Sequence, residues 1–267
     1  MSHAQPERRT LRAPDVIGAA RGGLDRVGRA ALMGAAIVWT LRTPRKYLHE
    51  SLAQAYAMGI RSLPLVVFMA IIGGAIASQQ TGSQFAGGLP VWVTGSVVAA
   101  GVLTELGPVL TAIVLIGRLG ASIAAELGTM KVTEQIDALY AIGRDPITLL
   151  IVPRVVGGAL VVPSLVIVAN ATGIFAGWFT GMLAIDGLTT ADFLFGARFY
   201  FRPWVLFYSV IKAAVFGVTI TFLACFIGLE GRGGAEGVGR TTTAAVVTTT
   251  VAIMLLDLLM IPLLKVA

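Results

Sequence analysis

The sequence has little charge, one cysteine and two histidines, and each shortage excludes a class of protein. Only 13% of the 267 residues are charged, against about 25% in an average soluble domain, too few to cover a globular surface. A single Cys225 excludes a disulfide within the chain and a cysteine metal cluster. Both histidines, His3 and His49, lie near the N-terminus and suggest no nucleophile–base pair. These shortages argue against a membrane-embedded enzyme acting on lipid.

Apolar residues are abundant instead. They make up 56% of the chain, and the mean hydropathy is +0.85, which predicts an integral membrane protein. The net charge of +6 lies entirely in residues 1–61, which hold ten Lys or Arg and four Asp or Glu. A basic arm ahead of the first span indicates a cytoplasmic N-terminus. Because the rest is expected to lie in lipid, no nucleic-acid partner is expected.

The N-terminal region is predicted to lie on the membrane surface. No small-residue cleavage site follows the apolar stretch between Arg29 and Arg42, so we expect no signal peptide. Interrupted apolar patches over residues 30–59 predict one or two amphipathic helices in the cytoplasmic interface. The chain therefore divides into a basic arm with an interfacial helix, residues 1–60, and a membrane domain, residues 61–267.

Five stretches are predicted to span the membrane. Residues 62–104 carry no charge and are longer than the roughly 20 residues needed for one crossing, so the polar stretch 78–84 is expected to divide them. The predicted spans are about 62–80, 90–117, 155–185, 203–228 and 241–264. The predicted fold is an all-α integral membrane protein with its C-terminus on the periplasmic side.

Three charged residues fall inside these spans: Glu105, Lys212 and Asp257. An unpaired charge at that depth costs about 2.5–3.5 kcal/mol even on the lenient insertion scale, so these groups should pair or face a water-filled cavity. They either fix helix packing as salt bridges or form the polar patch of a substrate cavity. Gly107 and Pro108 follow Glu105 closely and are expected to kink the helix there, which favours a cavity.

Residues 118–145 form the longest charged segment after the N-terminal arm. Their apolar residues repeat at three- and four-residue steps, which predicts an amphipathic helix rather than a span. With a cytoplasmic N-terminus this segment faces the cytoplasm. Its mixed charges suit a protein contact, a position on lipid headgroups or a solvated loop; they are Glu126, Lys131, Glu134 and Asp137.

Residues 234–241 read GAEGVGRT, which has the spacing of the phosphate loop G-x-x-x-x-G-K-[ST] except that Arg240 replaces the lysine. A phosphate loop also needs a buried strand before it and a soluble helix after it, whereas spans are expected on both sides here. We predict a connecting loop over residues 229–240, with Thr241 to Thr243 as helix caps. The chain is expected to bind no cofactor or metal.

The motifs ELGPVLTA (residues 105–112) and GRLGASIAAELGTMKVTEQIDAL (residues 117–139) resemble the signature of the MlaE/YrbE permease family. Asp145-Pro146, Val152-Pro153-Arg154 and the stretch GGAEGVGRTT are also similar to that family. The resemblance covers about residues 60–265. Thr104 and Arg144 depart from the family pattern, which bears only on fine detail of headgroup contacts.

The resemblance implies a membrane subunit of an ABC-type lipid transporter in the bacterial inner membrane. Such subunits are homodimers whose protomers each have an interfacial helix and five spans. A separate cytoplasmic ATPase binds ATP and magnesium, and a periplasmic MCE-domain protein receives or delivers the lipid. The segment around residues 118–140 would contain the coupling helix, between the second and third spans. Glu105, Lys212 and Asp257 match charged intramembrane positions of the family.

One alternative remains open on the residues alone. Glu105 and Asp257 could serve as proton sites of an ion-coupled carrier. Transport that needs a proton gradient but no ATP would distinguish this alternative from the ABC transporter.

Overall fold

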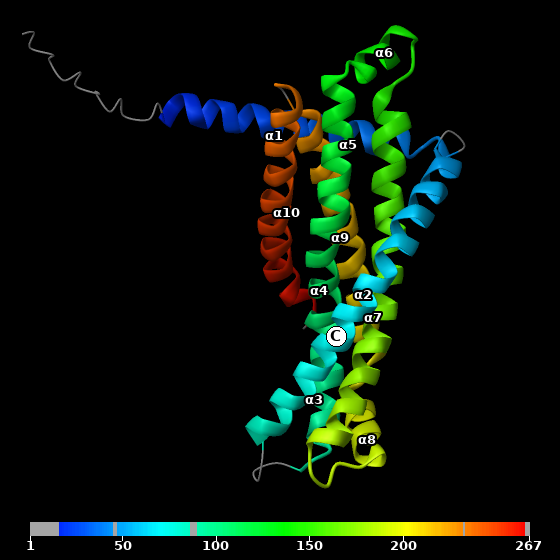
Figure 1. Ribbon diagram of the computed structural model, residues 1–267, viewed down its shortest axis with the longest axis vertical. Coiled ribbons are helices and arrows are strands. Elements are labelled where there is room, and N and C mark those ends of the chain that lie inside the picture. The colour runs from blue at the N-terminus through cyan, green and yellow to red at the C-terminus, as the bar shows by residue number, and fades with distance from the viewer. Residues whose placement is uncertain (1–15, 45–46, 86–89, 232, 265–267) are drawn as a thin grey trace, which may run out of the picture.

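The structure is a computed structural model that describes residues 16–44, 47–85, 90–231 and 233–264. Every regular element in these residues is helical, and Figure 1 shows a long bundle with one further helix, α1, lying across one end. The elements are α1 Val16–Thr40, α2 Leu48–Phe85, α3 Val93–Gly101, η2 Val102–Leu106, α4 Gly107–Leu115, η3 Ile116–Gly120, α5 Ala121–Val132, α6 Gln135–Ala141, η4 Ile147–Ile151, α7 Val152–Ala184, α8 Thr190–Tyr200, α9 Pro203–Leu229 and α10 Gly234–Leu264; the η segments are π-helical turns.

Five helical stretches are long and apolar enough to cross a membrane. This agrees with the number of spans predicted from the apolar runs. The stretches are Leu48–Gln84, Val93–Val132, Ile147–Ala184, Pro203–Leu229 and Gly234–Leu263.

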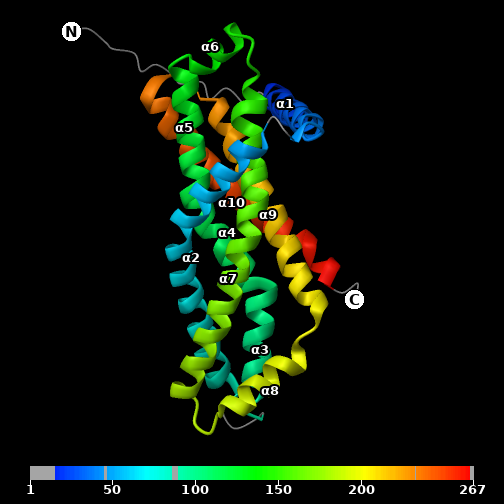
Figure 2. The same ribbon diagram turned by 90° about the vertical axis from the view of Figure 1, so that its right-hand side faces the viewer.

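The N-terminal helices differ from the prediction for residues 30–59. One helix, α1, occupies Val16–Thr40, and Figure 2 shows it nearly end-on beside the bundle. The next helix, α2, begins at Leu48 and continues to Phe85, so residues 48–59 belong to the same helix as the first span and do not form a separate one. The polar stretch 78–84 does not interrupt α2 either. Its hydroxyls are accommodated within the helix, as where Thr81 Oγ1 donates to the Ala77 carbonyl at 2.7 Å.

The second span continues further than predicted. Its helix runs from Val93 to Val132 through two π-turns, so the first part of the charged 118–145 segment is a direct extension of the span. The helix ends at Val132, Thr133 caps it, and Glu134 adopts a left-handed conformation with φ of 59°. The short helix α6 follows, at the tip of the bundle (Figure 1).

The prediction of a connecting loop over residues 229–240 is wrong, because GAEGVGRT forms the first turns of α10. The connection is short, and Gly233 and Gly234 take it through φ values of 89° and 72°, which glycine adopts freely. Thr241 is no helix cap: its hydroxyl donates to the Gly237 carbonyl at 3.0 Å, one turn back. The hydroxyls of Thr242 and Thr243 do the same within α10.

Close helix contacts hold α7 in the centre of the bundle, against α2 and α9. A Cβ on Gly74 of α2 would overlap the carbonyl of Gly173 on α7, and one on Gly177 would lie 2.6 Å from Val98. These small residues therefore bring helices of one chain together.

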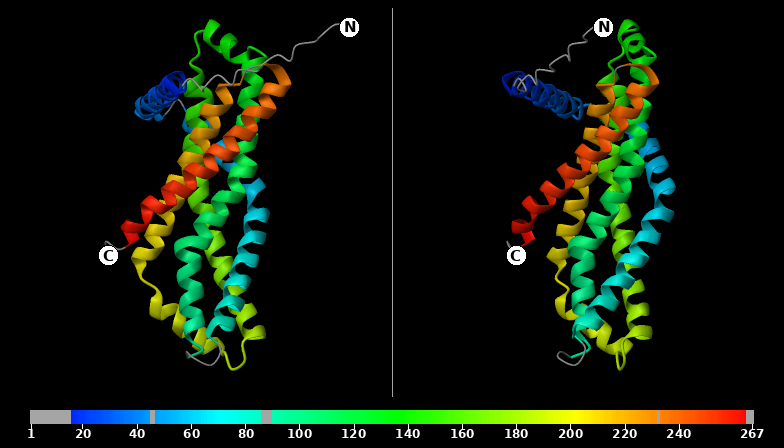
Figure 3. Two further views of the ribbon diagram at one scale, coloured as in Figure 1. Left: turned by 90° about the vertical axis from the view of Figure 1, so that its left-hand side faces the viewer. Right: turned by 60° about the vertical axis from the view of Figure 1, so that its left-hand side comes forward.

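In contrast to α7, helix α10 lies at the edge of the bundle, and Figure 3 shows its C-terminal end standing away from the other helices. It exposes a row of apolar side chains: Val247, Val251, Leu255, Leu258 and Leu259.

The bundle ends differ in chemistry. At the end away from α6, where Figure 1 places α3 and α8, aromatic rings cluster. Trp92 contacts Phe195 and Phe199 edge to face, with ring centroids 5.5 and 5.4 Å apart. Phe195 and Phe199 are exposed, as is typical of the aromatic belt at a membrane surface. The charged segment α5–α6 marks the other end.

Candidate functional site

The structure brings the three predicted intramembrane charges together around Lys212. This residue lies on α9, and its side chain is fully buried, with 0% exposed. Its Nζ lies 2.8 Å from Glu105 Oε2 of η2 and also forms an ion pair with Asp257 Oδ1 of α10. The ammonium donates in addition to the Thr104 carbonyl at 2.9 Å. Because an ammonium has three N–H donors, these contacts can use all of them. We call this cluster the Lys212 centre.

The local sequence around Glu105 explains why a backbone carbonyl is available to Lys212. In a regular α-helix the Thr104 carbonyl accepts from the N–H four residues later, but that residue is Pro108, which has none. Residues Val102–Leu106 form a π-turn immediately before this position, a feature often found at functional sites. The proline thus acts by freeing an acceptor that Lys212 binds. The helix continues through Gly107 and Pro108 as α4.

Gly107 has a packing role next to the same centre. A Cβ at this position would overlap Asn170 Oδ1 of α7. The Asn170 amide is buried and donates to Ser209 Oγ at 3.0 Å, one turn before Lys212 on α9. The glycine therefore lets α4 approach α7 closely. Tyr208 and Phe216 complete the wall, with the Lys212 ammonium 5.5 and 5.9 Å from their ring centroids, within the range of a cation–π contact.

The two acids of the Lys212 centre are more accessible than its lysine. The side chain of Glu105 is 43% exposed and that of Asp257 is 19% exposed. The centre formally contains one cation and two carboxylates, so its excess charge is acidic and lies on the open side. The ammonium of Lys212 has all its polar partners within the chain, whereas the partly exposed carboxylate of Glu105 is accessible to a further polar group. The role of these residues in binding a substrate stays a prediction.

The four residues expected to contact an ATPase lie in or next to α5 and α6, in two separate groups. Lys131 Nζ and Asp137 Oδ1 form an exposed ion pair of 3.0 Å that links the two helices. Glu134 lies between them in the left-handed conformation. Glu126 instead accepts from Arg154 Nη2 of α7 at 2.6 Å. Their proposed contact with another protein is likewise still a prediction.

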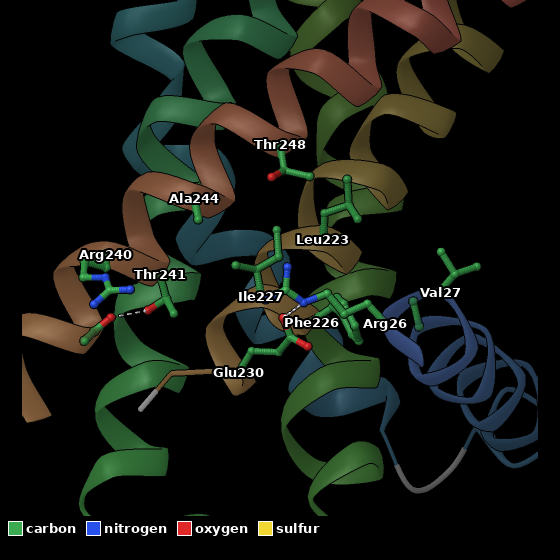
Figure 4. Close-up of a pocket in the computed structure, with 12 residues that line it drawn as sticks. Arg26, Val27, Leu223, Phe226, Ile227, Glu230, Arg240, Thr241, Ala244 and Thr248 are labelled. Carbon is green, nitrogen blue, oxygen red and sulfur yellow. Dashed lines mark hydrogen bonds and ion pairs between the residues drawn. The ribbon is translucent and has the colours of Figure 1, made fainter. Parts of the chain in front are cut away.

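A cavity that the sequence did not suggest lies between α1, α9 and α10 (Figure 4). Its volume is about 690 Å³, and its walls combine apolar side chains with Arg26, Glu230 and Arg240. Arg29 Nη2 donates to Glu230 Oε1 at 2.7 Å, and Arg26 Nε lies 3.6 Å from Glu230 Oε2. These contacts join residues about 200 positions apart, so no local pattern could reveal them. Thr241 of GAEGVGRT also lines this cavity, in the wall of a helix instead of a nucleotide loop.

Comparison with known proteins gives a family consistent with this arrangement. Residues 51–263 match the family described as Permease MlaE. A "Probable ABC transporter permease protein" of Rickettsia felis is 37% identical over 229 residues, covering 86% of this chain and 88% of the relative. A similarly named protein of Synechocystis sp. is 36% identical over 209 residues, covering 77% of this chain and 78% of the relative.

A plant protein is also similar to part of the chain. It is TRIGALACTOSYLDIACYLGLYCEROL 1 of Arabidopsis thaliana, a chloroplastic protein, and it is 41% identical over 165 residues. The match covers 61% of this chain and 46% of the plant protein. On the family match and the long similarity to permease proteins, the chain belongs to the MlaE permease family and is an ABC transporter permease, a membrane subunit that is not itself catalytic and works with an ATPase partner.

Proposed function

We propose that this permease moves phospholipid or a similar hydrophobic molecule between the inner membrane and a periplasmic MCE-domain protein. It acts as a homodimer and draws energy from a separate cytoplasmic ATPase. The observation that carries the proposal is the Lys212 centre, in which a half-exposed carboxylate, Glu105, lies on an open apolar face within the spans. The name of the Arabidopsis relative contains that of a galactolipid, which supports a lipid substrate.

An amphiphile suits this face better than a small polar solute. Charged side chains within membranes are costly and mark substrate pathways. The apolar row of α10, from Val247 to Leu259, is exposed next to the acidic side of the centre. A second copy of the chain placed against this face would close a cavity with apolar walls and a few polar groups, the usual composition of a ligand site.

The ATPase is proposed to transmit its ATP-driven movement to the permease through α5 and α6. The helix from Val93 to Val132 connects α5 to η2, which holds Glu105, and α6 follows after the left-handed turn at Glu134. A displacement of α5 by an ATPase bound at α5 and α6 would therefore be transmitted along one continuous helix to the Lys212 centre. Glu134 supports this contact role, because a non-glycine residue in the left-handed region costs about 1–2 kcal/mol, and such strained residues cluster at functional sites.

The test is reconstitution of the permease with its ATPase and the MCE-domain protein in vesicles that carry a labelled phospholipid. We expect ATP-dependent transfer and lipid-stimulated ATP hydrolysis. Replacing Glu105→Gln should lower the transfer while the complex still assembles, and Glu236→Gln, an exposed acid at the start of α10, is the control. Transfer that continues without ATP and stops when a proton gradient is collapsed would instead establish the ion-coupled carrier.

A further inference from the structure

A second cluster of charges surrounds a small cavity between α2, α5 and α7. Figure 2 shows where these helices run toward the α6 end of the bundle. The volume of the cavity is about 170 Å³. Three arginines from three different helical segments line it, together with two polar side chains and one acid. We call it the arginine pocket, and its polar lining is Arg61, Arg118, Arg154, Gln54, Ser122 and Glu126.

Positive charge exceeds negative charge in the arginine pocket. Arg154 is only 3% exposed and is bound by Glu126 at 2.6 Å and by the Leu150 carbonyl at 2.7 Å. Its Nε is buried and has no hydrogen-bond partner among the described residues. Arg118 Nη1 donates to the neutral Ser62 hydroxyl at 2.5 Å. The one carboxylate in the lining, Glu126, therefore offsets one of three guanidinium groups, that of Arg154, and no carboxylate in the lining offsets Arg61 or Arg118.

The pocket lies at a membrane surface. Each of its arginines stands at the end of an uncharged run: Arg61 precedes residues 62–104, Arg118 follows residues 106–117, and Arg154 precedes residues 155–185. Arg118 is 13 residues from Glu105, which is roughly 20 Å along the helix. The Lys212 centre thus lies within the spans, and the arginine pocket lies at the depth of the lipid headgroups.

We infer that the arginine pocket binds the phosphate group of a membrane phospholipid. Guanidinium groups bind phosphate through paired N–H donors, and basic pockets between membrane helices are known to hold anionic headgroups. The cavity volume of about 170 Å³ is larger than that of five water molecules at roughly 30 Å³ each. On the membrane side of Arg61, Leu63, Leu65 and Phe68 of α2 are exposed and offer apolar surface for the acyl chains.

A lipid phosphate held here bridges three helices next to the α5–α6 segment. Arg61 belongs to α2, Arg118 to η3 and Arg154 to α7, so one anion offsets the charge of Arg61 and Arg118 next to the Arg154–Glu126 pair. The site differs from the Lys212 centre in depth, in sign of charge and in lining. Binding at this site does not require that the lipid be transported, so it does not rest on the proposed function.

The test is native mass spectrometry and thermal unfolding of the purified full-length chain with phosphatidic acid or diacylglycerol. These lipids differ only in the phosphate. We expect phosphatidic acid to remain bound and to raise the unfolding temperature, and diacylglycerol to do neither. Arg118→Gln should weaken phosphatidic acid binding about fivefold, and Arg61→Gln with Arg118→Gln should weaken it about 25-fold, from roughly 1 kcal/mol per arginine at a membrane surface.

Two controls make the result decisive. Arg202→Gln removes an exposed arginine directly before the uncharged start of α9, at the opposite end of the bundle, and should leave binding unchanged. Arg118→Lys retains the charge and should keep part of the affinity. Equal binding of the two lipids, or full affinity in the double variant, would overturn the inference. Inorganic phosphate that competes as strongly as the lipid would also overturn it, since the site would then take a free anion.

Discussion

Two lysine–carboxylate pairs of nearly equal length have opposite surroundings in this permease. Lys212 and Glu105 are 2.8 Å apart within the spans, where the lysine side chain is 0% exposed. Lys131 and Asp137 are 3.0 Å apart at the bundle tip, where 37% and 58% of their side chains are exposed. Distance alone therefore does not tell what a pair contributes. Water weakens the exposed pair, whereas the fully buried Lys212 ammonium depends on its acidic partners for stabilisation.

The largest effect is expected from Lys212→Met. The substitution leaves Glu105 and Asp257 facing each other without a cation, so we expect a loss of about 3–5 kcal/mol in folding free energy. Thermal unfolding in detergent measures it. Neutralising all three residues, with Glu105→Gln and Asp257→Asn added, should restore much of the stability but not lipid transfer. A Lys212→Met protein as stable as the unmodified chain would show that this pair is as weak as the exposed one.

A smaller effect is expected from Gly107→Ala, which acts on the same centre through packing. The added methyl group overlaps Asn170 Oδ1 and should cost about 1–3 kcal/mol. Gly117→Ala is the matched control in the same span, because nothing lies within 4 Å of a Cβ there. The measurement is the unfolding temperature of each variant. If both variants unfold at the same temperature, the close approach of α4 and α7 at Gly107 does not contribute to stability.

The smallest effect on stability is expected from Lys131→Ala. An exposed pair of this kind contributes about 0–1 kcal/mol, so the unfolding temperature should hardly change. Binding of the ATPase, measured by co-purification, and lipid-stimulated ATP hydrolysis should both fall if this pair shapes the coupling contact. Exchanging the charges, with Lys131→Asp and Asp137→Lys, restores the pair but reverses its ends. Normal ATPase coupling in both variants would contradict a role for the pair.

The sequence predicted the spans more accurately than their ends. Long apolar runs with at most one charge located the five crossings, because burying a charge in lipid is costly. The predicted loop over residues 229–240 was wrong, because glycines permit a turn but do not require one. A backbone at the membrane surface gains hydrogen bonds by staying helical, and only Gly233 and Gly234 were needed to change direction.

For the candidate site, the sequence identified the residues but not their partners. Glu105, Lys212 and Asp257 could be singled out because each interrupts an apolar span. The role of Pro108 could not be foreseen, since it depends on Lys212 reaching a carbonyl 108 positions earlier in the chain. The Arg154–Glu126 pair and the arginine pocket were missed for the same reason, as their members come from separate helices.

The sequence by itself determined that this chain is an all-helical membrane protein, where its apolar segments lie, and to which family it belongs. These properties depend on composition and local order, because lipid excludes charge and requires every backbone group to be hydrogen-bonded within the segment. The tertiary structure alone decided which charges meet. Lys212 joins two acids within the spans, while three arginines gather at the membrane surface around one acid. That outcome depends on how α2, α7 and α9 pack against one another, which no single segment specifies.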